Sequence, residues 1–262
     1  RRGVNLNVER DPYVGVTHEY IDIPSNGMIH KARILDHADG SNRANKYERD
    51  AALLEEDLEK DPANGRSWYY LGNTYKDWGA TDPTKVPDAI AAYERRIKLG
   101  GWDEETHSAM MHRAACWKMW GDTDAFVEGM IEAYQFRPQR AEPLHALAQH
   151  YREAGKPAAS LLFSKTGMKI PRPNDVLFVN DFVYEHGLRY EYSIAGFYNA
   201  KERPVALQVT DDLALDPTCP HGLRYSARAN LFWYTKTLSD YCPSFTDRQI
   251  NFLPPRGYTA MN

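Results

Sequence analysis

The segment GRSWYYLGNTYKDWG, residues 65–79, decides how this chain of 262 residues is interpreted. It contains Trp68, Leu71, Gly72 and Tyr75 in the pattern W-x2-L-G-x2-Y. Steps of three and four residues place the three large side chains on one face of a helix. Gly72, at the fifth position of the pattern, lets a second helix approach closely. The segment therefore predicts the first helix of a tightly packed helix–turn–helix hairpin.

Further copies of the hairpin follow along the chain, and the pattern and its spacing are typical of tetratricopeptide repeats. Ala89 and Tyr93 fit the second helix of the first hairpin, about five residues late because TDPTKVP lengthens the turn. Ala114 and Ala148 occupy the small position of two later units, at the expected step of ~34 residues. The other matching residues of these units are Trp117, Gly121, Ala133 and Pro138, followed by Leu144, Leu147, Tyr151 and Gly155.

Weaker copies flank these units: a lone second helix at residues 48–62, a degenerate pair at 190–217 and a last helix at 227–238. Atypical terminal repeats are normal in such arrays. We expect an all-α, tetratricopeptide-type α-solenoid of helical hairpins, preceded by a short β remnant and followed by an extended tail. The expected boundaries are 1–25 for the strand remnant, 26–46 for a linker, 47–240 for the helical repeats and 241–262 for the tail.

Composition excludes several classes of function. The net charge is -4, and lysine and arginine are scattered, so the sequence does not predict nucleic-acid binding. No segment reaches the roughly 20 apolar residues of a membrane span. The three cysteines, at positions 116, 219 and 242, are not spaced as metal ligands, which favours a reducing, cytoplasmic compartment.

The segment YVGVTHEYI, residues 13–21, is predicted to be a strand that carries His18 and Glu19. A histidine beside a carboxylate can ligate a metal, so His18 is a candidate metal ligand and both residues are candidates for a pocket. The alternative is an ordinary surface dipeptide, because adjacent side chains on a strand point to opposite faces.

Two other metal patterns are rejected on spacing and context. The pairs His107/His112 and His145/His150 are five residues apart, which is about 140° around a helix, so neither pair can chelate one ion. The D-x-D at residues 122–124 follows a glycine at a predicted repeat turn, which favours helix capping. No complete active site is encoded in this chain.

Charged and polar residues cluster at two junctions between predicted helices. Such clusters typically pair across helices, and Arg140 is expected to cap carbonyl groups of the preceding helix. Ligand binding is the alternative role for both clusters. Their members are Arg137, Arg140 and Glu142 in FRPQRAEPL, and Asn180, Asp181, Tyr184 and Glu185 in FVNDFVYEHGL.

Several segments together resemble family 2 glycosyltransferases that carry tetratricopeptide repeats after a GT-A catalytic domain. The resemblance covers roughly residues 13–216 and includes VTHEYIDIP, NKYERDAALLEEDLEKDP, WYYLGNTYKDWG and FRPQRAEPLHALAQHYREAG. It implies that residues 1–25 are the C-terminal strand remnant of an upstream catalytic domain, with His18 and Glu19 near its sugar-nucleotide pocket. The family motif is Val-His-Glu, whereas here Thr17 separates Val16 from His18.

The resemblance implies a C-terminal repeat region that binds an acceptor polypeptide or glycan, or forms a homodimer, while catalysis occurs upstream. A divalent metal and a nucleotide sugar are expected for the full-length enzyme, and no cofactor for this chain. The competing interpretation is a stand-alone tetratricopeptide scaffold for protein–protein interaction. The expected ligand-binding residues on the first helices are Trp68, Tyr69, Asn73, Lys76, His112 and Arg113.

Overall fold

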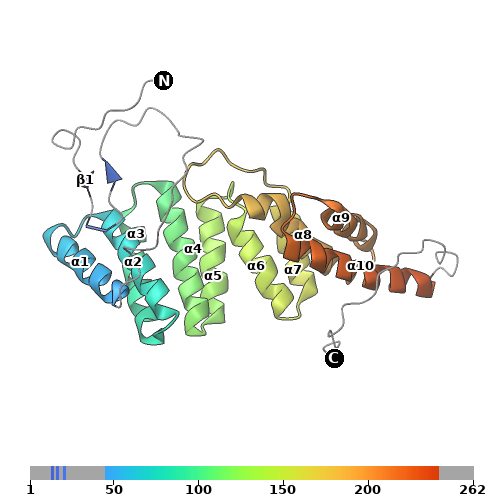
Figure 1. Ribbon diagram of the computed structural model, residues 1–262, viewed down its shortest axis with the longest axis horizontal. Coiled ribbons are helices and arrows are strands. Elements are labelled where there is room, and N and C mark those ends of the chain that lie inside the picture. Colours follow the sequence, from blue (N-terminus) through green and yellow to red (C-terminus); the bar gives the residue numbers. More distant parts are fainter. Residues whose placement is uncertain (1–12, 15, 18–19, 22–44, 242–262) are drawn as a thin grey trace, which may run out of the picture. The chain divides into compact units, whose positions relative to one another are not determined.

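The computed structural model describes residues 13–14, 16–17, 20–21 and 45–241. His18 and Glu19, most of the expected linker and all but the first residue of the expected tail lie outside the described residues. Within them the fold is all-α apart from one short strand pair (Figure 1). The helices are α1 (Lys46–Lys60), α2 (Gly65–Gly79), α3 (Val86–Leu99), α4 (Asp103–Trp120), α5 (Thr123–Phe136), α6 (Glu142–Glu153), α7 (Pro157–Gly167), α8 (Leu188–Phe197), α9 (Arg203–Leu215) and α10 (His221–Tyr241).

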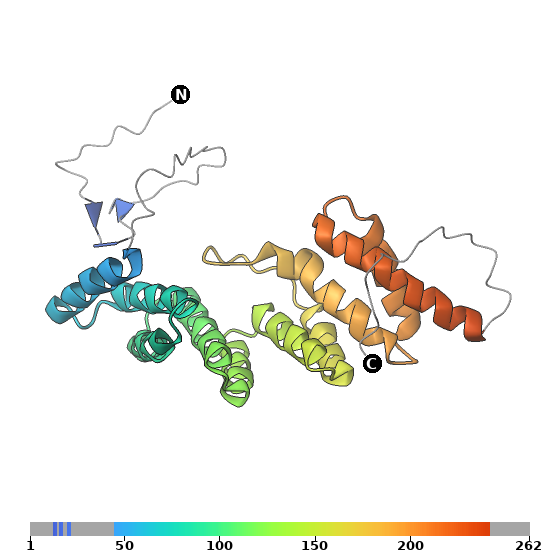
Figure 2. The ribbon, with the colours of Figure 1, turned by 60° about the horizontal axis from the view of Figure 1, so that its bottom comes forward.

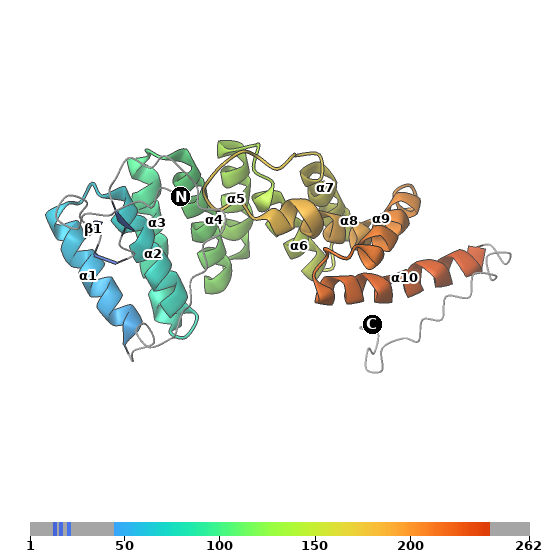
Figure 3. The ribbon, with the colours of Figure 1, turned by 45° about the horizontal axis from the view of Figure 1, so that its top comes forward.

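The chain forms two compact units, with the division after Gly129 inside α5. In the first unit α1 packs on α2, α2 on α3 and α3 on α4 (Figure 3). In the second unit α6 to α10 pack in the same sequential way, and α10 lies beside both α8 and α9 (Figure 2). Alternate helices also touch, namely α2 with α4, α6 with α8, and α8 with α10. This packing confirms the expected tetratricopeptide-type α-solenoid of helical hairpins.

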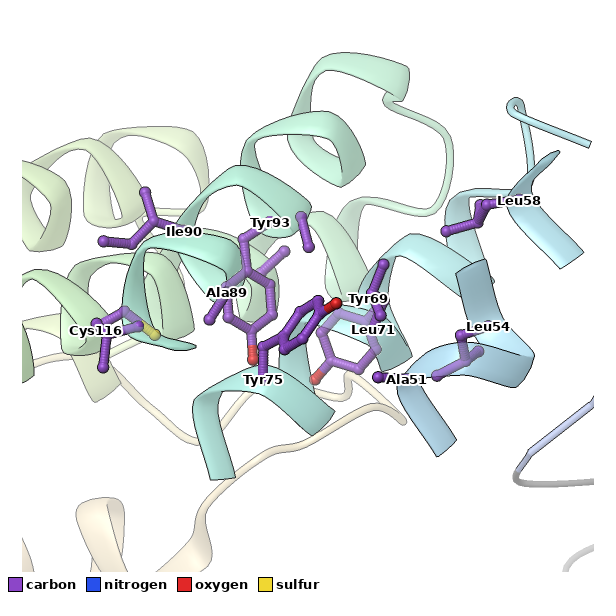
Figure 4. Close-up of a cluster of buried hydrophobic side chains, with 13 residues drawn as sticks. Ala51, Leu54, Leu58, Tyr69, Leu71, Tyr75, Ala89, Ile90, Tyr93 and Cys116 are labelled. Atoms are coloured by element: carbon purple, nitrogen blue, oxygen red, sulfur yellow. The ribbon is translucent and has the colours of Figure 1, made fainter. Parts of the chain in front are cut away.

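The predicted close approach at Gly72 is present. A methyl group added at Gly72 would lie 2.6 Å from Cε1 of Tyr93, a separation that real side chains do not adopt. Tyr93 and Ala89 are completely buried, and Leu71 and Tyr75 are also buried. These residues form one cluster with Leu54 and Leu58 of α1 (Figure 4). The motif therefore fixes both the α2–α3 contact and the packing of α1.

The predicted turns are also present. Gly121 and Gly155 end α4 and α6 with φ values of 93° and 67°, a left-handed conformation that favours glycine. Asp122 caps α5 by accepting a hydrogen bond from the backbone N–H of Ala125 at 2.9 Å, which confirms the predicted helix cap. The lengthened turn before α3 contains the short 3-10 helix Pro83–Lys85.

The repeat length is less regular than the expected step. Ala114 and Ala148 are both fully buried, as their alignment predicts. The first helices of successive hairpins are α2, α4, α6 and α8, which end at Gly79, Trp120, Glu153 and Phe197. The interval between successive helix ends varies from 33 residues, between Trp120 and Glu153, to 44 residues, between Glu153 and Phe197. The longest interval contains the connection from α7 to α8.

The strand prediction for residues 13–21 is wrong in detail. Tyr13–Val14 (β1) and Tyr20–Ile21 (β2) pair as two antiparallel strands, with Tyr13 opposite Ile21 and Val14 opposite Tyr20. Val16 and Thr17 form a bend between them. A bend at this point lets the β-forming residues at the two ends of the segment pair with each other.

We predict that Gly72→Leu lowers the free energy of unfolding by about 1–3 kcal/mol, because the new side chain overlaps the Tyr93 ring. Chemical denaturation followed by circular dichroism measures the change. Gly222→Leu is the control, because nothing lies within 4 Å of an added methyl group there. Equal stability of the two variants would contradict the assigned α2–α3 contact.

Candidate ligand-binding face

Tyr69, Asn73 and Lys76 lie on α2 at spacings of four and three residues, so they share one face of that helix. This face is turned toward α4, which α2 contacts directly. We call the surface formed by these residues, together with Ser108 and His112 of α4, the α2–α4 face. Asn73, Lys76 and His112 are half-buried and keep part of their surface accessible to solvent.

Hydrogen bonds connect the two helices across this face. Oδ1 of Asn73 lies 2.7 Å from the hydroxyl of Tyr93, which donates to it, and 3.1 Å from Nδ1 of His112. The hydroxyl groups of Tyr69 and Ser108 are 2.9 Å apart, and the rings of Tyr69 and His112 stack with centroids 5.9 Å apart. The side chain of Asn73 is therefore held in one orientation.

The imidazole of His112 is neutral in this environment. Burial, and secondly the nearby ammonium group of Lys76, lower the pKa of His112 to about 4. Burial also raises the pKa of Cys116, one turn further along α4, to about 12, so its thiol stays protonated. Lys76 therefore supplies the positive charge of this cluster near pH 7, and a neutral histidine and an amide lie beside it.

The six expected ligand-binding residues do not form one site. Trp68 is about 140° around α2 from Asn73 and faces the side of α1 and α3, where it packs against the core cluster. The ring of Tyr69 is only 1% exposed, because it packs between α2, α3 and α4, so it supports the face rather than presenting itself to a ligand. Arg113 follows His112 on α4 and is half-buried.

Side chains that meet on successive first helices are repeatedly 39 residues apart in the sequence, a spacing that could have revealed these partners. Tyr69 and Ser108 are 39 residues apart, and so are Asn73 and His112. In the second unit Nε of Arg152 on α6 donates to Oε2 of Glu191 on α8 at 2.6 Å, again across 39 residues. Ser108 and Glu191 were not identified from the sequence, because a repeat of irregular length hides which residues on successive first helices meet.

The Arg140 cluster has a structural role in this unit. The guanidinium is 2% exposed, forms two hydrogen bonds with Glu142 at 2.9 and 3.0 Å, and donates to the carbonyl oxygens of Leu177 and Phe178. It also donates to Asp175 at 3.1 Å. Arg140 thus satisfies carbonyl groups, as expected, but those of the α7–α8 connection rather than of the preceding helix.

The other members complete this network or lie outside it. The hydroxyl of Tyr184 donates to Glu142 at 2.7 Å, and the backbone N–H of Asn180 donates to Glu142 at 3.1 Å. Arg137 donates to both oxygens of Asp175 at 2.7 Å, whereas Asp181 pairs with Arg172 at the surface. Burial alone would raise the pKa of Glu142, but the hydrogen bonds from Arg140 and Tyr184 hold it below its usual value.

No group of three or more histidine, cysteine, aspartate or glutamate residues in the described part of the chain could hold a metal ion. His107 is fully buried, and His112 is engaged by Asn73. Among the helices that the structure describes, none combines the length and the apolar character needed to cross a membrane.

Comparison with known proteins finds similar solved structures. No protein-family model matches the chain, and no curated protein matches it. A crystal structure of MamA is 15% identical, with a TM-score of 0.46, and covers 80% of this chain and 99% of its own. YrrB, described as a TPR protein with an unusual peptide-binding site, is 15% identical, covers 70% of this chain and 84% of its own, and has a TM-score of 0.46.

Kinesin light chain TPR-like repeats from Podosopora anserina are also 15% identical, covering 68% of this chain and 89% of their own, with a TM-score of 0.46. Because the identities are low and each TM-score is below 0.5, these similarities carry no information about what this chain binds.

We predict that Lys76→Met raises the pKa of His112 toward its ordinary value of 6.5, because a like charge is removed from beside the imidazole. The measurement is a pH titration of the His112 Cε1–H resonance by nuclear magnetic resonance. Lys98→Met removes an exposed lysine near the end of α3 and is the control. An identical His112 pKa in the two variants would contradict the proximity of Lys76.

We predict that Arg140→Leu lowers the free energy of unfolding by about 3–5 kcal/mol at pH 7, because it leaves buried carboxylates without their partner. The folded-state pKa values of Glu142 and Asp175 are lowered, so this stabilisation is present above pH 4.5 and is lost as the pH falls through the folded values.

Urea denaturation at pH 7 and at lower pH measures both effects. Arg172→Leu removes an exposed ion pair with Asp181 and a hydrogen bond to the carbonyl of Pro173, and it is the control whose effect on stability is expected to be much smaller. A loss for Arg140→Leu that does not shrink below pH 4.5 would contradict the role assigned to the two carboxylates.

Proposed function

We propose that this chain is a protein-interaction module that binds an extended polypeptide on the α2–α4 face. The observation that carries this proposal is the fixed position of Asn73 beside Lys76. Tyr93 and His112 engage the amide oxygen of Asn73, at 2.7 and 3.1 Å, so that the amide does not need to be ordered when a ligand binds. An amide N–H and an ammonium group one turn apart suit the carbonyl oxygens of an extended chain.

The electrostatics of the face favour an acceptor-rich or acidic ligand. Lys76 keeps 24% of its side chain exposed and is 3.4 Å from Asp77, a surface pair that a ligand carboxylate can replace. His112 remains neutral near pH 7, because its pKa is about 4, and so adds no charge. Recognition therefore depends on one cation and on hydrogen bonds rather than on a strongly basic surface.

We further propose that this module is the repeat region of a family 2 glycosyltransferase and that its ligand is the acceptor polypeptide or glycan. What supports this assignment is the ordered sequence resemblance, from VTHEYIDIP at residues 16–24 through the helix at 45–62 to RPQRAEPL at 137–144. In that setting His18 and Glu19 line the rear of the upstream pocket, and the divalent metal and the nucleotide sugar belong to the catalytic domain.

The second candidate function is a stand-alone scaffold, which the helical-repeat architecture favours equally. A scaffold uses the same face for a protein partner or a second copy of the chain. The two candidates differ in what precedes Arg1 in the reading frame. An apolar strand ending in D-x-D about 100–200 residues upstream supports the transferase. A start codon directly before Arg1 would contradict the transferase and leave the scaffold.

Polypeptide ligands of this chain can be selected from a random peptide library. We predict that Lys76→Glu weakens their binding by about tenfold, because the new carboxylate repels the acceptor groups of the ligand. Fluorescence anisotropy with the selected peptides measures the affinity. Lys201→Glu makes the same charge change in the turn before α9 and is the control. Acidic peptides from the selection whose affinity is unaffected by Lys76→Glu would contradict binding on the α2–α4 face.

A further inference from the structure

A groove lies on the side of α2 opposite to Asn73. It has a volume of about 850 Å³ and runs between α1 and α3, with a floor formed by α2 and by Leu58 of α1. The floor is apolar and aromatic: Leu58, Leu71 and Tyr75 are buried there, and Trp68 is half-buried. The proposed function does not use this surface.

The α1 side of the groove is acidic. Glu55 and Glu59 are one turn apart, both are exposed, and both line the groove. No lysine or arginine of α1 lines it, and Lys60 pairs with Glu56 at 2.6 Å. Glu55 accepts a hydrogen bond from the hydroxyl of Tyr75, which fixes this carboxylate at the edge of the aromatic floor.

The α3 side carries both signs of charge. Asp88 and Glu94 line it together with Arg95 and Lys98, so the groove as a whole has four carboxylates and two cations. Lys85 lies 3.7 Å from Asp88 and balances part of its charge. The uncompensated negative charge therefore lies along α1, above an apolar floor.

We propose that this groove binds a cationic amphipathic segment of a partner polypeptide. Apolar side chains of the segment pack on Leu58, Leu71 and the Trp68 ring, and lysine or arginine side chains pair with Glu55 and Glu59. Charge complementarity argues for this occupant, because the exposed carboxylates on α1 are one turn apart and match cations spaced by one helical turn. The apolar floor supplies the contact area, and the acidic side sets the orientation.

The test uses the full chain and a fluorescein-labelled peptide of about 14 residues, close to the length of α1. Leu occupies positions i, i+3, i+4 and i+7 of the peptide, and Lys occupies the flanking positions. Fluorescence anisotropy should show saturable binding that weakens as the salt concentration rises. A peptide with Glu in place of each Lys should not bind.

Two variants of α1 form a matched pair. Glu59→Lys is expected to weaken binding by about tenfold, whereas Glu56→Lys, with the same net charge change on the same helix, should change it by less than about twofold. Ala91→Arg fills the groove from the exposed side of α3 and should also weaken binding by about tenfold, whereas Ala52→Arg on the exposed surface of α1 should not. Far-UV circular dichroism checks that each variant is folded.

Equal affinities of the Glu59→Lys and Glu56→Lys variants would overturn the proposal, as would binding of the Glu peptide with the same affinity. A dimer in sedimentation experiments that only Glu59→Lys dissociates would also overturn it, by assigning the groove to a second copy. Lys76→Glu should leave binding of the Lys peptide unchanged, so failure of this proposal is distinguishable from failure of binding on the α2–α4 face.

Discussion

The contact between Gly72 and the ring of Tyr93 is the constraint on which the first unit depends. Only a residue without a side chain lets α2 and α3 approach this closely, because any Cβ would lie 2.6 Å from the ring. The same contact buries Tyr93 completely and delivers its hydroxyl to Asn73 at 2.7 Å. Packing of the hairpin and orientation of the candidate binding residue therefore have one cause.

Helix α2 separates two surfaces of different chemistry. Tyr69, Asn73 and Lys76 face α4 and form a polar cluster with one cation, whereas Trp68, Leu71 and Tyr75 face an acidic groove between α1 and α3. The division follows from helical geometry, since Trp68 and Asn73 are about 140° apart. A single repeat can thus present two different surfaces without any change of backbone.

The second unit shows how an irregular repeat is kept ordered. The interval from Glu153 to Phe197 is long, and residues 168–180 within it lie outside any helix. Arg140 instead holds the connection before α8, through Asp175 and two backbone carbonyl groups. The guanidinium can be buried because each of its nitrogen atoms has a hydrogen-bond acceptor. These hydrogen bonds offset the free-energy cost of removing its charge from water.

The sequence alone determined the helical-hairpin fold, the α2–α3 contact and the glycine-ended turns at Gly121 and Gly155. Each of these depends on local spacing, which sequence records directly. Only the tertiary structure decided that Tyr69 meets Ser108, that Asn73 meets His112, and that Arg140 meets Asp175. These pairings join residues 35 to 39 positions apart. Where repeat length varies, register between successive helices is set by packing and loop length, and sequence spacing alone does not specify it.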